Sequence, residues 1–528
     1  MKLLRVVLVF VVFNLFHGFA HGQVAGAKEL HKLQVAWQII NTLYVDTVNS
    51  AQLSEAAIQA MLQQLDPHSS YISAKELSAL NEPLEGSFDG IGIEFSIIRD
   101  TLVVASVIGG GPSEKVGLQV NDRIVKIDDK DIAGNGLTNS QVFKLLRGKK
   151  GSKVVLTVVR KAEKQPLVFD IRRDKIPIFS VDASYMIDQR TGYIKISRFG
   201  AQTHEEFVKS LKDLVNQGMK GLMIDLRGNG GGYLKAAFDI ADELIDDNKM
   251  IVYTKGQASP LMEFKSSSKG LFEKGALVVL IDEGSASASE IVAGAIQDWD
   301  RGVIVGRRSF GKGLVQRPIK LPDGSEIRLT TAKYYTPSGR CIQKSYRNGT
   351  GDYEKEIFQR LQSGELSNQD SLPVKGHERY QTLMAGRTVY GGGGIYPDRF
   401  VPLDTTRMSP LMQSIFRTGL LQRYSVSLME NYNGKLTGYK DFDSFSQAFL
   451  IEDAMLSLLV DQAAGEGIVC SIADLRKEEM LLTQIKAYLA RRLFNTSEFY
   501  RVVNPQTDIY KQGVDILTKT RDYNQLLK

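Results

Sequence analysis

The chain has 528 residues, of which 43% are hydrophobic and 24% are charged, and its formal net charge is +6. One hydrophobic core cannot serve a chain of this length, so roughly three or four domains are expected. The small net charge, with both signs interspersed, is typical of a globular protein and argues against nucleic-acid binding. Six scattered histidines and two cysteines, Cys341 and Cys470, predict no metal site and no disulfide framework.

The first residues have the pattern of a secretory signal peptide. Two basic residues precede an apolar run over residues 6–13, and the small-residue sequence Ala20-His21-Gly22 follows. The apolar stretch is about eleven residues long, whereas a bilayer span needs about twenty, so a permanent anchor is the weaker alternative. We expect residues 1–22 to be removed and the mature chain to be periplasmic or secreted.

The periodicity of apolar residues then changes three times along the chain. Helical spacing over residues 23–80 predicts a small helical N-terminal domain. Alternation over residues 86–173, interrupted by short helical stretches at 113–117 and 140–148, predicts a compact strand-rich module with two helices.

Apolar strands alternate with helices over residues 176–404, which predicts an α/β domain whose sheet is covered on both faces. Helical spacing returns over residues 405–528, with stretches at 446–464 and 474–495. We expect this last domain to be helical and to have a structural or assembly role.

The sequence GSASASE contains three serines, at positions 285, 287 and 289, between the strand ALVVLID and the helix EIVAGAIQDW. The first N–H groups of a helix have no intrahelical partner and lie at its positive end, so an oxyanion forming there is stabilised. A serine hydroxyl at such a junction is a candidate nucleophile, although serine is also a common helix cap. Spacing alone does not choose among the three serines.

A serine nucleophile needs a base, and Lys312 in GRRSFGKGLVQ (306–316) is a better candidate than the scattered histidines. Burial would have to lower its pKa from about 10.4 to roughly 7 to 8. The same stretch matches most of a nucleotide-binding Walker loop, but Gly313 replaces the magnesium-binding Ser or Thr, and the residues that follow are strand-like. Nucleotide binding is therefore the weaker alternative.

Five motifs together resemble the carboxy-terminal processing proteases, the tail-specific serine peptidases of family S41. They are DLRGNGGG (225–232), GSASASEIVAGAIQD (284–298), GRRSFGKGLVQ (306–316), TTAKYYTPSGR (330–340) and GGIYPD (393–398), in the order of that family. The resemblance covers roughly residues 30–405. It implies an α/β serine protease core of the ClpP/crotonase-like type within a multidomain α/β protein.

The resemblance also implies roles for particular residues. Ser287 would be the nucleophile and Lys312, twenty-five residues further on, its base, with Gln316 positioning the lysine. The oxyanion donors would be the N–H of Ala288 and that of Gly230 or Gly231. Asp225 and Arg227 are expected to be structural. Asp298 matches a family position of less settled role, and a structural role at the end of the helix explains it equally well.

The strand-rich module resembles a PDZ domain through GIGIEF (90–95), GGGPSEKVGLQVNDRIVKID (109–128) and SQVFKLLRG (140–148). Backbone N–H groups near Gly90, Ile91 and Gly92 would bind a terminal carboxylate, and a peptide strand would pair with the edge of residues 91–95, which includes Ile93. The final apolar side chain would enter a pocket near Val142 and Leu145. Arg147 is expected to be solvated rather than in contact with the protease domain.

The sequence thus predicts a serine-type endopeptidase that binds apolar C-terminal tails of protein substrates and needs no cofactor or metal. A catalytically silent PDZ scaffold is the alternative from another functional class, and the paired serine turn and glycine-flanked lysine disfavour it. The helical end domains are compatible with a homodimer.

Overall fold

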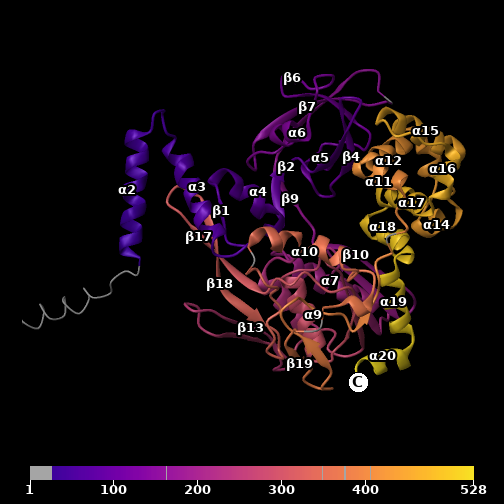
Figure 1. The fold of residues 1–528 in the computed structure, drawn as a ribbon. Helices are drawn as coiled ribbons and strands as arrows, with labels where there is room; N and C mark the ends of the chain where they lie inside the picture. Colours follow the sequence, from indigo (N-terminus) through magenta and orange to yellow (C-terminus); the bar gives the residue numbers. More distant parts are fainter. Residues whose placement is uncertain (1–25, 162, 348, 374–375, 405) are drawn as a thin grey trace, which may run out of the picture. The chain divides into compact units, whose positions relative to one another are not determined.

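The structure is a computed structural model that describes residues 26–161, 163–347, 349–373, 376–404 and 406–528. The predicted signal peptide lies outside these residues. The chain forms two compact units, Met1–Tyr71 and Ile72–Lys528, whose elements are labelled in Figure 1. Among the helices in the described ranges, none is both long and apolar enough to cross a membrane.

The first unit is helical, as predicted. It contains α2 (Ala27–Leu43) and α3 (Ser50–Gln63), and the side chain of Asn49 caps α3 by accepting the N–H of Gln52. The chain turns after α3 because the Asp66 carboxylate accepts the N–H groups of His68 and Ser69, at 2.8 and 2.9 Å. Helix α2 buries none of its side chains, so the apolar stripe that predicted a packed helix face is exposed.

The second unit begins at the end of strand β1 (Ser70–Ile72) and continues through helix α4 (Ala74–Glu85) into the strand-rich module. The module's main sheet is antiparallel, with strand order β3-β4-β5-β7-β8 and β6 paired to β5. Strands β2 and β9 form a separate antiparallel pair at the two ends of the module, where the chain enters and leaves it. The bounds are β2 (Ser87–Gly90), β3 (Ile93–Ile98), β4 (Thr101–Val107), α5 (Pro112–Lys115), β5 (Arg123–Ile127), β6 (Lys130–Asp131), α6 (Asn139–Leu146), β7 (Lys153–Val159), β8 (Leu167–Arg172) and β9 (Asp174–Pro177).

The α/β domain is built on a sheet with strand order β10-β11-β12-β15-β16-β21, in which only β10 runs antiparallel. Parallel strands need crossover connections, and helices α7, α8 and α9 supply them. The bounds are β10 (Val181–Met186), β11 (Thr191–Ile196), α7 (Thr203–Asn216), β12 (Gly221–Asp225), α8 (Leu234–Asp242), β15 (Ala276–Ile281), α9 (Ala288–Asp298), β16 (Val303–Gly306) and β21 (Arg399–Phe400).

Both faces of this sheet are covered, as the continuous apolar strands predicted. Leu222 and Ile224 of β12 pack with α7, α8 and α9 in one cluster, while Met223 between them packs with the C-terminal residues Ile509 and Tyr510. The second cover is helix α19 (Asp508–Thr518), which follows α18 (Thr496–Val503) and the short helix η2 (Asn504–Gln506) and precedes α20 (Thr520–Leu526). The core thus takes part of its cover from the segment that the sequence assigned to a separate C-terminal domain.

A second, antiparallel sheet extends from the α/β domain and includes β13, β14, β17 and β18. The residues after the Walker-like stretch form strand β17 rather than a helix, as predicted. The bounds are β13 (Met250–Lys255), β14 (Met262–Lys265), β17 (Leu314–Lys320), β18 (Glu326–Tyr335), α10 (Thr350–Gln362), η1 (Gln369–Ser371), β19 (Arg379–Gln381) and β20 (Thr388–Tyr390).

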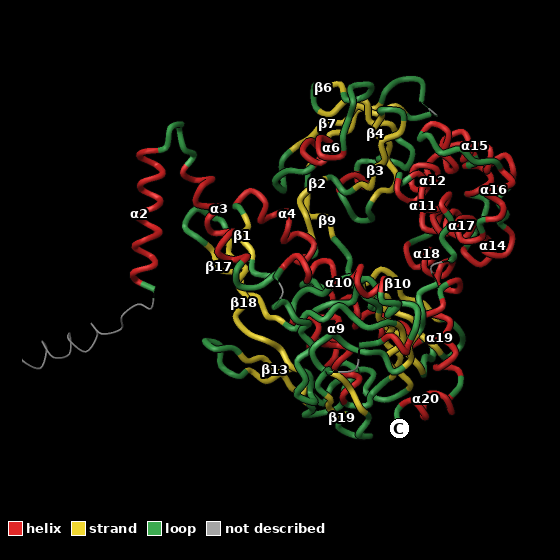
Figure 2. Tube along the Cα trace, in the orientation of Figure 1, coloured by secondary structure: helices red, strands yellow, loops and turns green. Residues whose placement is uncertain are grey.

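Helices α11 to α17 form the C-terminal helical module (residues 410–493), which has its own core; Figure 2 shows its helical content. Both helical stretches predicted here are broken in two. Phe449 ends α14 with an extended backbone, and its ring stacks on Phe445 with centroids 4.9 Å apart; Glu478 separates α16 from α17. The bounds are α11 (Pro410–Arg417), α12 (Leu420–Asn431), α13 (Asn433–Leu436), α14 (Phe442–Ala448), α15 (Asp453–Gly465), α16 (Ile472–Lys477) and α17 (Glu479–Leu493).

Gly513 tests whether α19 is an essential cover of the core sheet. A Cβ added there would lie 2.9 Å from Met223 Cε and 3.0 Å from Leu280 Cδ2. We predict that Gly513→Val lowers the free energy of unfolding by about 1–3 kcal/mol through overpacking, measured by urea denaturation. Gly465→Val is the control, because a Cβ at Gly465 has no neighbour within 4 Å. Equal stability of the two variants would contradict tight packing of α19 on the sheet.

Candidate active site

Three loops that carry the predicted site residues leave the core sheet at the same edge. The glycine loop (residues 226–233) follows β12, the serine turn (282–287) follows β15, and the base loop (307–313) follows β16. Strands β12, β15 and β16 are adjacent and parallel, so their carboxyl ends lie side by side. In sheets of this kind, ligands bind outside the carboxyl ends of the strands.

Ser287 has an unusual backbone conformation at the start of α9. Its φ is 54° and its ψ is −111°, in a region that residues with a Cβ rarely adopt. A serine on a sharp strand-to-helix turn with a strained backbone presents its hydroxyl outward, as the nucleophile elbow of other hydrolases does. The turn achieves this without the GxSxG sequence.

The three serines of the turn differ in burial and bonding. Ser285 and Ser289 are both fully buried, and their hydroxyls donate to the carbonyl oxygens of Leu226 and Asn229, each at 2.8 Å. Ser287 is partly exposed, and no described group accepts a hydrogen bond from its hydroxyl. The geometry therefore separates Ser287 from its neighbours, which the spacing could not do.

Glu290, in the first turn of α9, connects the serine turn to the base loop. Its side chain is fully buried, and Oε2 accepts the N–H of Ser287 at 2.7 Å and the N–H of Lys312 at 2.9 Å. Oε1 accepts the N–H of Gly311 at 2.7 Å and the hydroxyl of Ser309. Because one carboxylate oxygen binds both backbones, Ser287 and Lys312 are held next to each other although they lie far apart in sequence.

Burial raises the pKa of Glu290 to about 7, against the hydrogen bonds that lower it.

Tyr334 of β18 makes a second link between the serine turn and the base loop, because its hydroxyl is hydrogen-bonded to the carbonyl oxygens of both Ser287, at 3.1 Å, and Lys312. Burial, and then the charge of Glu290, raise the pKa of Tyr334 well above its usual value, so this phenol stays neutral. The sequence analysis missed both residues. The sequence does place Glu290 in the first turn of the predicted helix, but acidic residues are common at that position in ordinary helices, so the position did not indicate a special role.

Lys312 is half-buried, and its Nζ donates to Gln316 Oε1 at 3.2 Å. The structure thus brings together the residues predicted as base and positioning partner. The glycines beside the lysine permit close packing, since a Cβ at Gly311 would lie 3.2 Å from the backbone of Gly393, and one at Gly313 would lie 2.9 Å from the N of Gln343.

A buried ionic cluster supports the base loop from behind. Arg360 of α10 donates to the carbonyl oxygens of Arg308 and Ser309, at 2.6 and 3.1 Å. Glu365 pairs with both Arg308 and Arg360. Buried charges of this kind are stable only when all of their partners are present. The ion pairs and hydrogen bonds from α10 therefore fix the path of the loop that carries Lys312.

The glycine loop, in which the second oxyanion donor is expected, lies against Ser287. A Cβ at Gly231 would lie 2.8 Å from the Cβ of Ser287 and 3.0 Å from the N of Ala288. The N–H of Gly231 donates to Asn229 Oδ1 at 2.9 Å, whereas within the described chain no acceptor binds the N–H of Gly230 or Ala288. The arrangement favours Gly230 over Gly231 as the donor that acts with Ala288.

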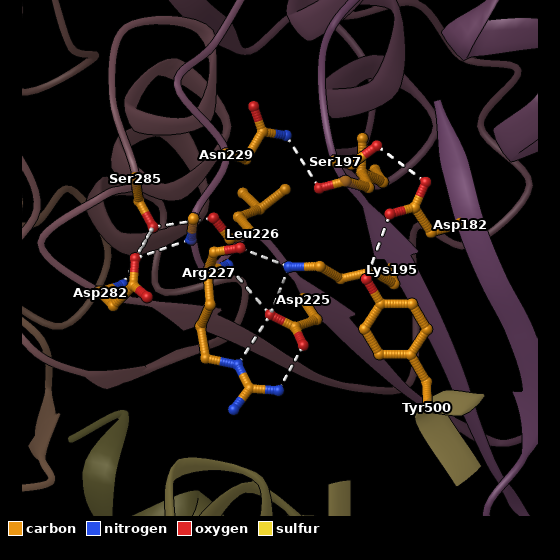
Figure 3. A network of polar contacts seen from close by, with 12 residues as sticks. Asp182, Lys195, Ser197, Asp225, Leu226, Arg227, Asn229, Asp282, Ser285 and Tyr500 are labelled. Carbon is orange, nitrogen blue, oxygen red and sulfur yellow. Dashed lines mark hydrogen bonds and ion pairs between the residues drawn. The ribbon is translucent and has the colours of Figure 1, made fainter. Parts of the chain in front are cut away.

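Figure 3 shows the polar network behind the glycine loop. Asp225 is fully buried and accepts hydrogen bonds from Tyr193, Lys195 and Arg227. Burial alone would raise the pKa of Asp225, but the charges of Arg227 and Lys195 outweigh it and hold the pKa below its usual range. Arg227 also binds Asn504 Oδ1 and Thr507 Oγ1, each at 3.1 Å. Asp225 and Arg227 thus anchor the loop to the C-terminal segment, in keeping with a structural role.

Asp298 and His204, which is one of the six histidines, have structural partners. Asp298 is buried at the end of α9, where it pairs with Arg340 at 2.7 Å and accepts the N–H of Ser338 at 2.9 Å. His204 pairs with Glu243 at 2.8 Å. In the ranges that the structure describes, no group of three or more His, Cys, Asp or Glu side chains is arranged to hold a metal ion.

The candidate tail site lies between β3 and α6 of the strand-rich module. Gly90 ends β2, and no described acceptor binds the N–H of Ile91 or Gly92, although both residues are buried. Ile93 begins β3, an edge strand that pairs only with β4 in this sheet. Val142 is fully buried and Leu145 partly so, in the core beneath α6.

Two contacts lie beside this candidate site. The rings of Phe95 on β3 and Phe143 on α6 meet edge to face, with centroids 5.3 Å apart. Arg147 is not simply solvated as expected, because it pairs with Glu82 of α4 and lies over the rings of Phe88 and Phe143. The end of α6 is therefore tied to the helix that leads into the module.

Four family models match the chain. Peptidase family S41 matches residues 190–351, and a PDZ domain matches residues 90–170. The N-terminal domain of the activating protease CtpB matches residues 17–76, and a family of unknown function matches residues 411–495.

Known proteins match over about the same region. The chain is 38% identical over 322 residues to the carboxy-terminal processing protease CtpB of Bacillus subtilis, a match that covers 60% of this chain and 66%, slightly under two-thirds, of the relative. It is 37% identical over 321 residues to a carboxy-terminal-processing protease of Bartonella bacilliformis, covering 60% of this chain and 73% of the relative. A solved photosystem II D1 C-terminal processing protease is 29% identical and covers 58% of this chain and 88% of its own, with a TM-score of 0.33. From the family models and the two relatives, the chain belongs to peptidase family S41, among the carboxy-terminal processing proteases with a PDZ domain.

Proposed function

We propose that the protein is a serine endopeptidase in which Ser287 is the nucleophile and Lys312 is its base. The observation that carries this proposal is the shared anchoring of the two residues. Glu290 binds both of their N–H groups and Tyr334 binds both of their carbonyl oxygens. Ser287 is also the partly exposed serine of the turn.

In the proposed reaction, the neutral amine of Lys312 takes the proton of the Ser287 hydroxyl as its oxygen attacks the substrate carbonyl. The N–H groups of Ala288 and Gly230 stabilise the negative charge on the tetrahedral oxygen. The Lys312 ammonium then protonates the leaving amine, and a peptide fragment with a new amino terminus departs. Water, deprotonated by Lys312, attacks the remaining ester. The bond between the carbonyl carbon and the Ser287 oxygen then breaks, the Lys312 ammonium returns its proton to that oxygen, and the product leaves with a new carboxyl terminus.

Gln316 supports this cycle by orienting the base. Its side-chain oxygen accepts one hydrogen from the Lys312 amine, at 3.2 Å. An amide oxygen accepts a hydrogen bond without adding a negative charge, so it fixes the amine without stabilising the ammonium as a carboxylate would.

The PDZ domain supports capture of substrates by their C-terminal tails. The N–H groups of Ile91 and Gly92, which have no acceptor in the described chain, suit a terminal carboxylate, and the edge of β3 suits an added peptide strand. We further propose that the enzyme acts outside the cytoplasm after removal of residues 1–22 and that its tail pocket takes apolar residues.

The first prediction compares the serines of the turn. Ser287→Ala and Lys312→Ala should each lower kcat by about 10³-fold or more, because each removes a partner of the proton transfer. Ser285→Ala should keep most of the activity per folded molecule, because the Ser285 hydroxyl donates a hydrogen bond to a backbone carbonyl and takes no part in the reaction. The measurement is cleavage of an unfolded protein that ends in apolar residues.

Two outcomes would contradict the proposal. Equal cleavage by wild type and both dyad variants would exclude Ser287 and Lys312 as the reacting groups. Binding of the tail by wild type without any cleavage would favour the scaffold alternative. Circular dichroism and thermal melts show that the variants compared are folded.

The second prediction concerns the carboxylate that joins the two loops. In Glu290→Gln the amide keeps one acceptor oxygen and directs an NH₂ group at backbone N–H donors, so at least one of them loses its partner. We expect kcat to fall by about 10²-fold with little change in KM, because the reacting groups lose their alignment while the tail site stays intact. Glu263→Gln, an exposed carboxylate on β14, is the matched control and should keep wild-type kcat. Wild-type kcat in Glu290→Gln would show that the link is dispensable.

The third prediction uses the raised pKa of Glu290. Its pKa is about 7 in the folded protein and 4.5 in its unperturbed state, so the folded state binds the proton more tightly. The resulting contribution to stability is fully present below pH 4.5 and is lost as the pH rises through about 7. The free energy of unfolding of wild type, relative to Glu290→Gln, should therefore fall by up to about 3 kcal/mol over this range. Urea denaturation at a series of pH values measures it, and a difference independent of pH would exclude the shift.

A further inference from the structure

Strand β4 of the PDZ domain is apolar on both faces. Leu102 and Val104 point into the domain's own core, while Val103 and Ala105 between them point to the opposite face and are still buried, at 0% and 4% exposure. An antiparallel sheet with one solvated face alternates apolar and polar residues. The outer face of β4 is therefore covered by another part of the chain.

That cover is the C-terminal helical module. Val426 of α12, with 1% exposure, packs with Val103 and Ala105, and Ile98 of β3 packs against the same cluster. The contact is between segments more than three hundred residues apart in sequence, and it joins two bodies that each have a core of their own.

Arg492, in the last turn of α17, adds a specific polar contact to this apolar one. Its guanidinium donates to the carbonyl oxygen of Ala105 at 2.8 Å, and also to Ser425 Oγ at 2.8 Å and the carbonyl of Gln422 at 3.3 Å. Burial lowers the pKa of Arg492 to about 10. A partly desolvated cation keeps its hydrogen-bond partners, so it favours one placement of the strand on the helices.

Ion pairs between the two bodies flank the cluster. Arg123 of β5 contacts both carboxylate oxygens of Glu430, at 3.1 and 3.2 Å. Glu94 of β3 pairs with Arg491 at 2.6 Å. One pair has its cation on the PDZ domain and the other has it on the module, so the pairs specify orientation as well as attraction.

We infer that the C-terminal helical module, which matches a family of unknown function, is a docking platform for the PDZ domain. It holds the outer face of β3 and β4 and leaves the backbone edge of β3 to a peptide. The platform is itself fixed to the core sheet, because α17 leads into α18, where Ser497 accepts the N–H of Ser184 and Tyr500 donates to Asp182, each at 3.2 Å. The PDZ domain is thus held to the protease core by a second connection besides its own linkers.

Single-molecule energy transfer in the full chain tests the dock. Dyes are attached to cysteines that replace the exposed residues Lys130 and Val469, in a background with Cys341→Ser and Cys470→Ser. Wild type should give one narrow transfer-efficiency peak. Glu430→Arg, which opposes Arg123 with a like charge, should add a second population of at least about 10% of the molecules, and Val426→Asp should make it the larger one.

The reciprocal swap Arg123→Glu with Glu430→Arg should restore the single peak. Asp453→Arg reverses an exposed charge that pairs with Arg476 inside the module, and it should leave the peak unchanged. A single narrow peak in both Glu430→Arg and Val426→Asp would overturn the dock, as would a second population in Asp453→Arg. If Val426→Asp does not fold, the charge variants decide. The readout is independent of peptidase activity, so its failure is distinguishable from failure of the proposed chemistry.

Discussion

The carboxylate of Glu290 is the constraint on which the site depends. A buried carboxylate is costly unless its oxygens are hydrogen-bonded, and here backbone N–H groups from two different loops, with a serine hydroxyl, supply the partners. The same bonds that satisfy Glu290 therefore bring the serine turn and the base loop together. Because α9 is buried along its whole length, its first turn has little freedom to shift, and the two loops inherit that rigidity.

The core sheet and the ionic clusters around the site hold these loops in fixed positions. Adjacent parallel strands place three loops at one edge of the sheet, and glycine at position 231 lets the glycine loop approach Ser287 within van der Waals contact. Behind the loops lie two ionic clusters, one around Asp225 and one around Arg308 and Glu365. A strained serine backbone persists only where its surroundings determine it completely, which is what these supports provide.

The sequence predicted most of the framework because strands and helices have distinct periodicities, and the glycine-rich and serine-rich turns fall where strands end. It could not choose among three equivalent serines, since the hydroxyls of Ser285 and Ser289 are committed to carbonyl groups that belong to another loop. It also missed Glu290 and Tyr334. Their importance arises from partners brought close by folding, and neither residue type is unusual at its position in a helix or a strand.

The C-terminal 124 residues have one helical pattern throughout, but their helices pack against different parts of the protein. Period 3.6 predicts helices, but it does not say what their apolar faces cover. Helix α19 covers the core sheet, whereas α12 covers a PDZ strand to which Arg492 of α17 is hydrogen-bonded. The informative signal lay in the strand and not in the helices, because LVVA in β4 is apolar at consecutive positions and an isolated PDZ domain would expose half of them. A strand with two apolar faces implies a partner for each face, and the chain supplies the second one itself.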